Sequence, residues 1–371
     1  MEKVRFGIVG LGNQGSLYRR ILTEGQIKDG VCASVCDVDG QKRAKHREDF
    51  PDIPVYETAG AMFASGNCDV VLIETPHYEH PSLAIEAMAA GLHVVVDKPA
   101  GVYTKQVKEM LRAHKAQYPD RMLGIMFNQR TNPVFKKMKE MIAEGKLGEI
   151  KRTNWIITDW YRSDAYYGSG SWRATWAGEG GGVLYNQSPH QLDLFSWIVG
   201  MQPTKVRAFC HFGKWHDIEV EDDVTAYVEY ANGATGTFIT CTADAPGTNR
   251  FEITGTRGTL IFDRNSLIFR ELAMDEREWC HTTDKAFRTP EWTESVIEVE
   301  GDNPQHKGIL QNVTDTLLGR DTLYAPAEDG LNGVMLANAM HLSAFLDRTV
   351  ELPIDDELFY EELQKRINKQ K

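Results

Sequence analysis

Lys98 and His190 are the two side chains of this sequence best suited to handle a proton at a reacting oxygen. Lys98 ends the apolar run 93–97 and is followed at once by a proline. His190 follows the glycine run 180–182 and begins a helix-like pattern, with Asn186 four residues earlier. An imidazole titrates near neutral pH, whereas a lysine becomes a base only after a large fall in its pKa. We therefore expect His190 to accept a proton and Lys98 to polarise and place a hydroxyl group.

A glycine-rich loop, Gly10-Leu-Gly12-Asn-Gln-Gly15, follows the apolar run 4–10 and opens a helical pattern. Gly10 permits a tight turn, Gly12 lets the backbone approach a pyrophosphate, and Gly15 lets helix and strand pack closely. The N-terminus of the helix attracts the phosphates. In this context the spacing predicts a Rossmann-type dinucleotide site.

Asp37 stands 22 residues after Gly15, at the end of the second apolar run. A carboxylate at this position accepts hydrogen bonds from the adenosine ribose and repels the additional phosphate of NADP. The expected cofactor is therefore NAD. Lys42 and Arg43 follow a few residues later, so the use of NADP stays open.

The elements that position these residues fall into two patterns. Short apolar runs alternate with helical stretches up to residue 127, which predicts parallel strands joined by helical crossovers. Longer polar and aromatic strands follow, and Asn232-Gly233 between two of them is a hairpin signal. We expect an α/β chain with an N-terminal Rossmann domain, a doubly wound parallel sheet (1–127), and a C-terminal α+β domain with a large, mostly antiparallel open sheet (128–371). The end of the second domain is free to fold back on the first.

The composition narrows the function classes. A net charge of −12 argues against nucleic acid or an anionic membrane as a partner. Six scattered cysteines without CxxC spacing are expected to be buried free thiols, and no ligand pattern predicts a metal site. No apolar run is long enough to cross a bilayer, and the first strand begins at Val4, so we expect a cytoplasmic protein.

Further passages resemble the glucose-fructose oxidoreductase, inositol dehydrogenase and MocA family, over nearly the whole chain. Three carry most of the resemblance: Thr75-Pro-His-Tyr-Glu-His80, Ala90-Gly-Leu-His-Val-Val-Val-Asp97-Lys98-Pro99, and Gly180-Gly-Gly-Val-Leu-Tyr-Asn186-Gln-Ser-Pro-His190-Gln-Leu-Asp193. Glu221-Asp-Asp223, Asn232-Gly-Ala234 and Gly255-Thr-Arg-Gly-Thr259 look like the family's second domain. The sequence departs from the family pattern twice. Asp97 replaces a glutamate, and Asn186 replaces an aspartate that could assist a proton relay.

The resemblance implies an NAD(P)-dependent oxidoreductase that acts on CH–OH groups of a sugar, inositol or related polyol. The implied catalytic residues are Lys98, His190 and Asn186, and the Lys98–Pro99 peptide is expected to be cis. The cofactor is expected to bind at Gly10, Gly12, Asn13, Gln14, Gly15, Asp37, Thr75, Pro76, His77, His80, Asp97 and Lys98. The substrate is expected at Lys98, Tyr161, Arg162, Trp172, Arg173, Trp176, Asn186 and His190. Trp160 and Tyr166-Tyr167 belong to the same aromatic stretch, which could equally pack the sheet or a subunit interface.

Two other functions remain open. One is redox-neutral glycoside cleavage, in which bound NAD transiently oxidises C3 of the sugar. The other is a non-catalytic nucleotide-binding regulator, against which the presence of both Lys98 and His190 argues. The antiparallel sheet, rich in Val, Ile, Phe and Thr, is expected to leave one face partly apolar. We therefore expect a homodimer or homotetramer that packs through the second domains.

Overall fold

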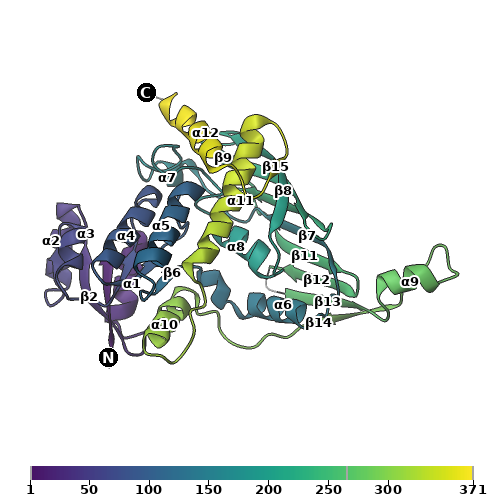
Figure 1. The fold of residues 1–371 in the computed structure, drawn as a ribbon, viewed down its shortest axis with the longest axis horizontal. Helices are drawn as coiled ribbons and strands as arrows, with labels where there is room; N and C mark the ends of the chain where they lie inside the picture. The colour runs from purple at the N-terminus through teal and green to yellow at the C-terminus, as the bar shows by residue number, and fades with distance from the viewer. Residues whose placement is uncertain (1, 265, 370–371) are drawn as a thin grey trace. The chain divides into compact units, whose positions relative to one another are not determined.

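The computed structural model describes residues 2–264 and 266–369, which form two compact units (Figure 1). The first unit comprises Met1–Thr131 and Pro304–Val334. The second comprises Asn132–Asn303 and Met335–Lys371. The chain thus leaves the first unit after Thr131 and returns to it for one later segment. Residues 1, 265 and 370–371 lie outside the described part.

The first unit contains a six-stranded parallel sheet in the order β3-β2-β1-β4-β5-β6. Its central strands are buried along almost their whole length, as expected for a sheet with helices on both faces. The order reverses between β1 and β4, where ligands of doubly wound sheets bind. The strands are β1 (Val4–Val9), β2 (Gly30–Cys36), β3 (Val55–Tyr56), β4 (Val70–Ile73), β5 (His93–Val96) and β6 (Leu123–Ile125). The helices are α1 (Asn13–Thr23), α2 (Gly40–Asp49), α3 (Ala59–Phe63), η1 (His77–Glu79), α4 (His80–Ala89), α5 (Thr104–Gln117), η2 (Asn128–Thr131) and α10 (Gln305–Leu317).

Helix α10 completes the core of the first unit although it is distant in sequence. Its apolar residues Ile309, Leu310 and Val313 are buried in the same hydrophobic core as the parallel strands. Polar bonds hold the helix at its start and near its middle. The Gln311 side chain accepts a hydrogen bond from the Lys28 backbone N–H (2.8 Å), and the Asn128 amide donates to the Gln305 side chain (2.7 Å).

The second unit contains a nine-stranded sheet in the order β14-β13-β12-β11-β7-β10-β9-β8-β15. Its pairs are antiparallel except β10–β7, so the predicted α/β class with a mostly antiparallel second sheet is confirmed. The predicted hairpin is present, with Gly233 at φ +84° between β9 and β10. The strands are β7 (Ile150–Ile157), β8 (Pro203–Phe212), β9 (Glu221–Tyr230), β10 (Thr235–Cys241), β11 (Asn249–Gly255), β12 (Gly258–Asp263), β13 (Ser266–Leu272), β14 (Trp292–Val296) and β15 (Val350–Glu351).

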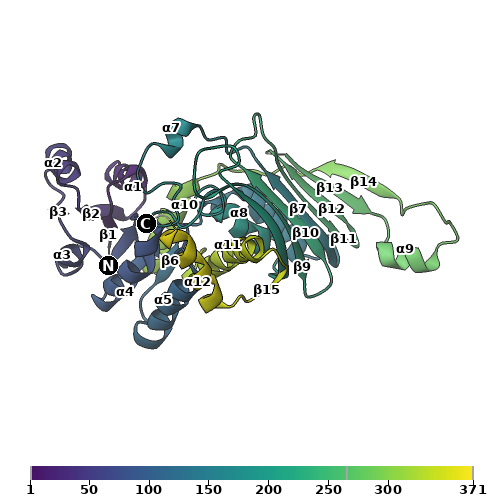
Figure 2. The same cartoon turned by 90° about the horizontal axis from the view of Figure 1, so that it is seen from above.

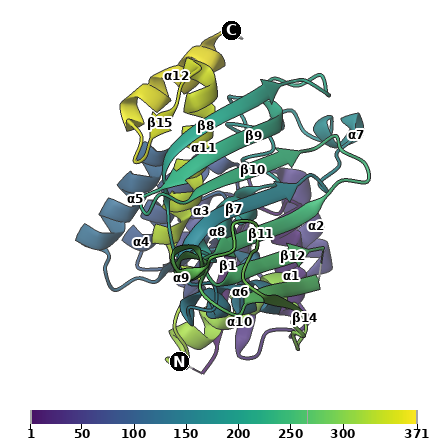
Figure 3. The same ribbon diagram turned by 90° about the vertical axis from the view of Figure 1, so that its right-hand side faces the viewer.

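Helices pack against one face of this sheet (Figure 3). Phe135 of α6 and Phe195 of α8 reach aromatic side chains of the sheet, where Trp155 stacks on Phe251 at 4.4 Å. The long helix α11 lies on the same side, and its Ser343 hydroxyl accepts a hydrogen bond from β8. The helices are α6 (Pro133–Ala143), α7 (Asp164–Tyr167), α8 (Pro189–Trp197), α9 (Glu276–Thr282), α11 (Ala327–Leu346) and α12 (Asp356–Asn368).

The opposite face of the second sheet carries exposed side chains, including Phe209 on β8 and Tyr227 on β9. Beyond β13 and β14 the chain extends into an arm that bears α9 (Figure 2). Cys280 on this helix is exposed, because α9 contributes no buried residue, so the expectation of buried thiols is wrong there. Cys32 and Cys210 are only partly buried. Within the described ranges, no helix has the length and apolar character of a bilayer-spanning segment.

Candidate functional site

The glycine loop of the first unit has the geometry that its spacing predicts. Gly10 adopts φ +99°, and a Cβ there would lie 2.5 Å from the Glu74 carbonyl oxygen. A Cβ at Gly15 would lie 1.8 Å from the Gly10 carbonyl oxygen, so α1 approaches the loop more closely than any side chain permits. Gly12 instead faces open space, with nothing within 4 Å of a Cβ built on it.

Asp37 follows β2 and its carboxylate is almost fully buried. One oxygen accepts a hydrogen bond from the Leu11 N–H of the glycine loop (2.7 Å), and the other accepts from the Asp39 N–H (2.8 Å). The Lys42 ammonium lies 3.2 Å from the first of these oxygens. Arg43 donates to the backbone carbonyls of Asp37 and Val38. The charged groups of Lys42 and Arg43 are thus both engaged with acceptors in the segment that follows β2.

These features fit a dinucleotide. The N-terminus of α1 has no side-chain cap, so its first N–H groups are available to a pyrophosphate, next to the open space at Gly12. Asp37 retains lone pairs for ribose hydroxyls after its backbone bonds. Asn13 opens α1 and is exposed, whereas the Gln14 amide donates to the Tyr18 hydroxyl (2.9 Å).

The carboxyl ends of β4 and β5 are joined by His80. Its two ring nitrogens lie 2.8 Å from the Pro99 carbonyl oxygen and 2.7 Å from the Thr75 carbonyl oxygen. His80 is fully buried at the start of α4, so it acts as a bridge between the segment after β4 and the segment after β5. The Lys98–Pro99 peptide is cis, as predicted. Pro76 is exposed and His77 is buried in the turn between Thr75 and His80.

In the second unit, the glycine run is anchored by a buried glutamate. One carboxylate oxygen of Glu221, at the start of β9, accepts hydrogen bonds from the N–H groups of Gly182 (2.9 Å) and Leu184 (3.0 Å). Its other oxygen lies 2.8 Å from Nε2 of His341 on α11, and neither side chain is exposed. The loop that leads to α8 is therefore tied to both the sheet and α11.

Asn186 lies on this loop in a network of polar side chains. The Tyr166 hydroxyl donates to the Asn186 side-chain oxygen (2.8 Å) and accepts from Arg173 (2.6 Å). The Asn186 amide donates to the carboxylate of Glu179, which is almost fully buried and lies 3.7 Å from the Arg173 guanidinium. Burial raises the pKa of the Tyr166 phenol, so it stays protonated and able to donate at neutral pH. His190, the second residue of α8, follows on the same loop–helix segment and is partly exposed.

The aromatic residues predicted to bind substrate separate into two groups. The Arg173 guanidinium stacks on Tyr166 at 4.4 Å and on Trp172 at 4.7 Å. Arg162 lies 5.0 Å from the Tyr166 ring, so these residues gather around the Asn186 network. Trp176 is instead buried and packs edge-on against His341 and Phe345 in the core. Tyr161 is exposed.

Four polar residues near these positions were not among the predicted site residues. Glu179 directly precedes the glycine run and bonds Asn186, so its place in the motif was the available signal. Glu74 directly follows β4 as Asp97 directly follows β5, so its place after a buried strand was the available signal. Gln187 donates to both Tyr166 and Asn186. His306 had no local signal, because α10 reaches the first unit only through the tertiary fold.

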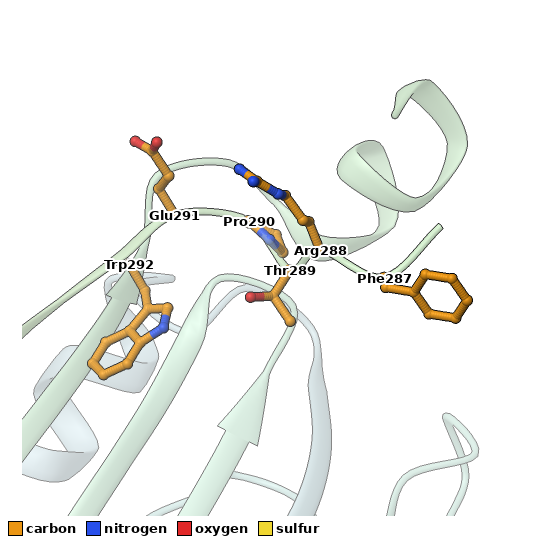
Figure 4. A pocket seen from close by; sticks show the side chains of 6 residues that line it. All are labelled: Phe287, Arg288, Thr289, Pro290, Glu291 and Trp292. Carbon is orange, nitrogen blue, oxygen red and sulfur yellow. The ribbon is translucent and has the colours of Figure 1, made fainter. Parts of the chain in front are cut away.

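A separate surface hollow lies in the arm between α9 and β14 (Figure 4). Six consecutive residues line it, and Phe287 points away from it into solvent. None of them is among the predicted site residues. Across the described ranges, no group of three or more His, Cys, Asp or Glu side chains could hold a metal ion.

Comparison with protein families agrees with this architecture. Residues 4–119 match an oxidoreductase family model with an NAD-binding Rossmann fold. Residues 135–261 match the C-terminal domain of the same family. The two models together match more than half of the chain. The protein belongs to the Gfo/Idh/MocA oxidoreductase family.

Three individual proteins show how similar this chain is to known relatives in sequence and structure. The rhizopine catabolism protein MocA of Rhizobium meliloti is 30% identical over 207 residues, which span 56% of this chain and 61% of that protein. Levoglucosan dehydrogenase of Pseudarthrobacter phenanthrenivorans is 29% identical over 313 residues, 76% of this chain and 77% of that protein. The structure of the WlbA dehydrogenase of Bordetella pertussis with NADH and UDP-GlcNAcA is 26% identical, with a TM-score of 0.78 over 95% of this chain and 100% of that chain.

Proposed function

We propose that this protein is an NAD-dependent dehydrogenase that transfers a hydride between nicotinamide and a hydroxyl carbon of a cyclic sugar, inositol or related polyol. The observation that carries the proposal is the uncapped N-terminus of α1 beside the doubly held carboxylate of Asp37. The substrate class rests on relatives named for levoglucosan and crystallised with UDP-GlcNAcA.

The nicotinamide supplies the hydride chemistry when the cofactor is bound. Gly10, Gly12 and Gly15 with the α1 N-terminus hold the pyrophosphate, and Asp37 holds the adenosine ribose. The expected cofactor residues Thr75, His77, Asp97 and their neighbours lie at the same carboxyl edge of the parallel sheet. NAD is the favoured cofactor because Lys42 and Arg43 are already engaged with Asp37 and backbone carbonyls.

Two residues divide the proton chemistry in this proposal. His190 accepts the proton of the substrate hydroxyl as the hydride leaves, because an imidazole is half-ionised near neutral pH. The Lys98 ammonium donates a hydrogen bond to the same oxygen and polarises it. Asn186 orients a substrate hydroxyl, since it is fixed by Tyr166 and Glu179 and cannot itself take up a proton.

The test is a panel of sugars and polyols assayed with NAD⁺ and NADP⁺ by the absorbance of reduced nicotinamide. His190→Ala and Lys98→Met are expected to lower kcat by roughly 10²–10⁴. Both variants should still bind NADH, because neither residue belongs to the glycine loop that holds the pyrophosphate. The exposed residues His211 and Lys115 provide matched controls as His211→Ala and Lys115→Met, which should behave like the wild type.

The outcomes separate the competing functions. Net cofactor reduction with a sugar or polyol supports the proposal. Glycoside turnover without net reduction would identify a redox-neutral lyase, and tight NADH binding without any turnover would identify a nucleotide-binding regulator. Should His190→Ala keep full activity while Lys98→Met is inactive, Lys98 is the base and the division of labour is reversed.

A further inference from the structure

Two carboxyl groups lie side by side at the carboxyl edge of the parallel sheet. Strands β4 and β5 are parallel neighbours with Ile73 opposite Val96, so the next residues, Glu74 and Asp97, are adjacent as well. The Asp97 N–H donates to the Ile73 carbonyl oxygen (3.1 Å), which holds the two strand ends in this register. The Glu74 carbonyl oxygen faces Gly10, and both oxygens of its carboxyl group are buried.

The Glu74 carboxyl group lacks the partners that a buried charge requires. In the described part of the chain, no N–H or O–H group hydrogen-bonds either of its oxygens. Its nearest acidic neighbour, Asp97, is also an acceptor when ionised, so the two carboxyl groups can bond only if one of them carries a proton. Burial raises the pKa of Glu74 well above its usual range, Asp97 raises it further, and Lys98 acts in the opposite direction.

The other titratable groups that face this pair are neutral at neutral pH. Tyr18 on α1 is fully buried, and burial together with Glu74 and Asp97 raises the pKa of its phenol. His306 on α10 lies 5.5 Å from the Tyr18 ring, and burial lowers the pKa of its imidazole. The charge balance of the cluster is therefore set by Glu74, Asp97 and Lys98. With one proton on the carboxyl pair this cluster is electrically neutral, and without it an uncompensated negative charge stays buried.

We propose that Glu74 is a positioning residue that holds a proton and donates it in a hydrogen bond to Asp97, so that the pair presents one negative charge to Lys98. This inference deepens the proposed function, since it rests on Lys98 as the group that polarises the reacting hydroxyl. A second negative charge beside Lys98 would stabilise its ammonium and weaken its hydrogen bond to the substrate oxygen. The proton on Glu74 thus keeps Lys98 an effective donor, and its loss at alkaline pH should reduce turnover.

Infrared spectroscopy tests the protonation directly and without any substrate. Wild-type protein at neutral pH should show the carbonyl stretch of a buried protonated carboxyl group, and Glu74→Gln should lack this band. The matched control is Glu79→Gln, since Glu79 is exposed in η1 and its removal should leave the band unchanged. A wild-type spectrum without the band, or a band that survives in Glu74→Gln, overturns the proposal.

The pH dependence of stability gives a second, activity-independent readout. A group whose pKa is raised in the folded state contributes stability that is present at low pH and is lost as the pH rises through that pKa. Wild-type Tm should therefore fall relative to Glu74→Gln, whose neutral amide cannot ionise, as the pH rises from about 4.5, the ordinary pKa of the carboxyl group, towards the raised pKa of the folded state. Parallel Tm curves for the two proteins would contradict a proton on Glu74.

The pH dependence of kcat/KM distinguishes a positioning role of Glu74 from a purely structural one. In the wild type, kcat/KM should decline at alkaline pH as Glu74 ionises, and in Glu74→Gln this decline should disappear while activity at neutral pH is retained. An unchanged alkaline decline in Glu74→Gln would show that Glu74 does not act on Lys98. If no polyol is a substrate, the infrared and Tm results still decide the protonation, so failure of the proposed function is distinguishable from failure of this inference.

Discussion

The carboxylate of Asp37 shapes the glycine loop, and in the proposed function it also binds the adenosine ribose. Its bond to the Leu11 N–H is short and buried, so the side chain is fixed before any nucleotide arrives. Such preorganisation favours binding, because no side-chain freedom is lost when the ribose hydroxyls are bound. The same fixed charge repels the additional phosphate of NADP.

Asp37→Asn should therefore lower the preference for NAD. The amide keeps the size of the side chain but removes the repulsive charge, so the ratio of the Kd for NADPH to that for NADH should fall by roughly tenfold, about 1.4 kcal/mol. Titration of both reduced cofactors by fluorescence measures this ratio. The control is Asp39→Asn, which changes the N-cap of α2 to another good cap and should leave the ratio unchanged. Equal or tighter binding of NADPH by the wild type would refute the preference.

Tyr166 gives a second prediction at the level of a single residue. Its hydroxyl group forms hydrogen bonds with Arg173, Gln187 and Asn186. Tyr166→Phe should release Asn186 and lower kcat/KM roughly tenfold, the scale of one or two hydrogen bonds that hold a substrate-binding group. The matched control is Tyr230→Phe, which removes a buried hydroxyl bonded to Thr153 in the sheet. It should lower Tm without an effect on kcat/KM, and an equal kinetic loss in both variants would argue against a role for Asn186.

At the scale of elements, the Glu221–His341 pair determines how firmly the glycine run is held. Glu221→Ala should destabilise the protein by about 3–5 kcal/mol, because it leaves two loop N–H groups without their acceptor and removes the carboxylate beside the buried His341 imidazole. Urea unfolding measures the change. Glu229→Gln on the same strand is the control, since Glu229 makes exposed contacts with Lys205 (3.6 Å) and the Tyr227 hydroxyl (3.5 Å), and the change should cost roughly 0–1 kcal/mol. Similar losses for both variants would show that the buried pair has no special role.

The sequence was informative about elements with a strong local pattern. The hairpin predicted at Asn232-Gly233 is observed between β9 and β10, and the parallel strands predicted up to residue 127 are observed as β1 to β6. Short edge strands such as Val55–Tyr56 and Val350–Glu351 were not predicted, since two residues carry no periodicity. Trp176 was predicted at the substrate site, and its burial in the core shows that aromatic character alone does not separate core from site.

Site residues could be predicted from the sequence where they belong to a motif. They could not be predicted where only the tertiary structure brings them together. Gly10, Gly15 and Asp37 show the local geometry that their spacing implies. The bond between Asn186 and Glu179 was missed, because it joins two positions seven residues apart across a glycine run without helical or strand period. The approach of His306 to Tyr18 depends on the return of the chain to the first unit.

At the scale of the whole molecule, the exposed face of the second sheet remains the expected oligomer interface. Phe209 is about half exposed on β8, and Tyr227 is exposed on the paired strand β9. Exposed aromatic side chains on an open sheet face favour self-association. Light scattering at micromolar protein should report a dimer or tetramer, and Phe209→Glu should shift the distribution towards the monomer. A monomeric wild type would contradict the prediction.

The return of residues 304–334 to the first unit has a consequence for biosynthesis. A ribosome completes the six parallel strands by residue 125, but α10 emerges only after the whole stretch 132–303 has been translated. Until then, the apolar surface that Ile309, Leu310 and Val313 later cover stays open to water. We therefore expect the nascent first unit to stay incompletely folded until residues 304–334 have been synthesised, and to bind chaperones during that interval.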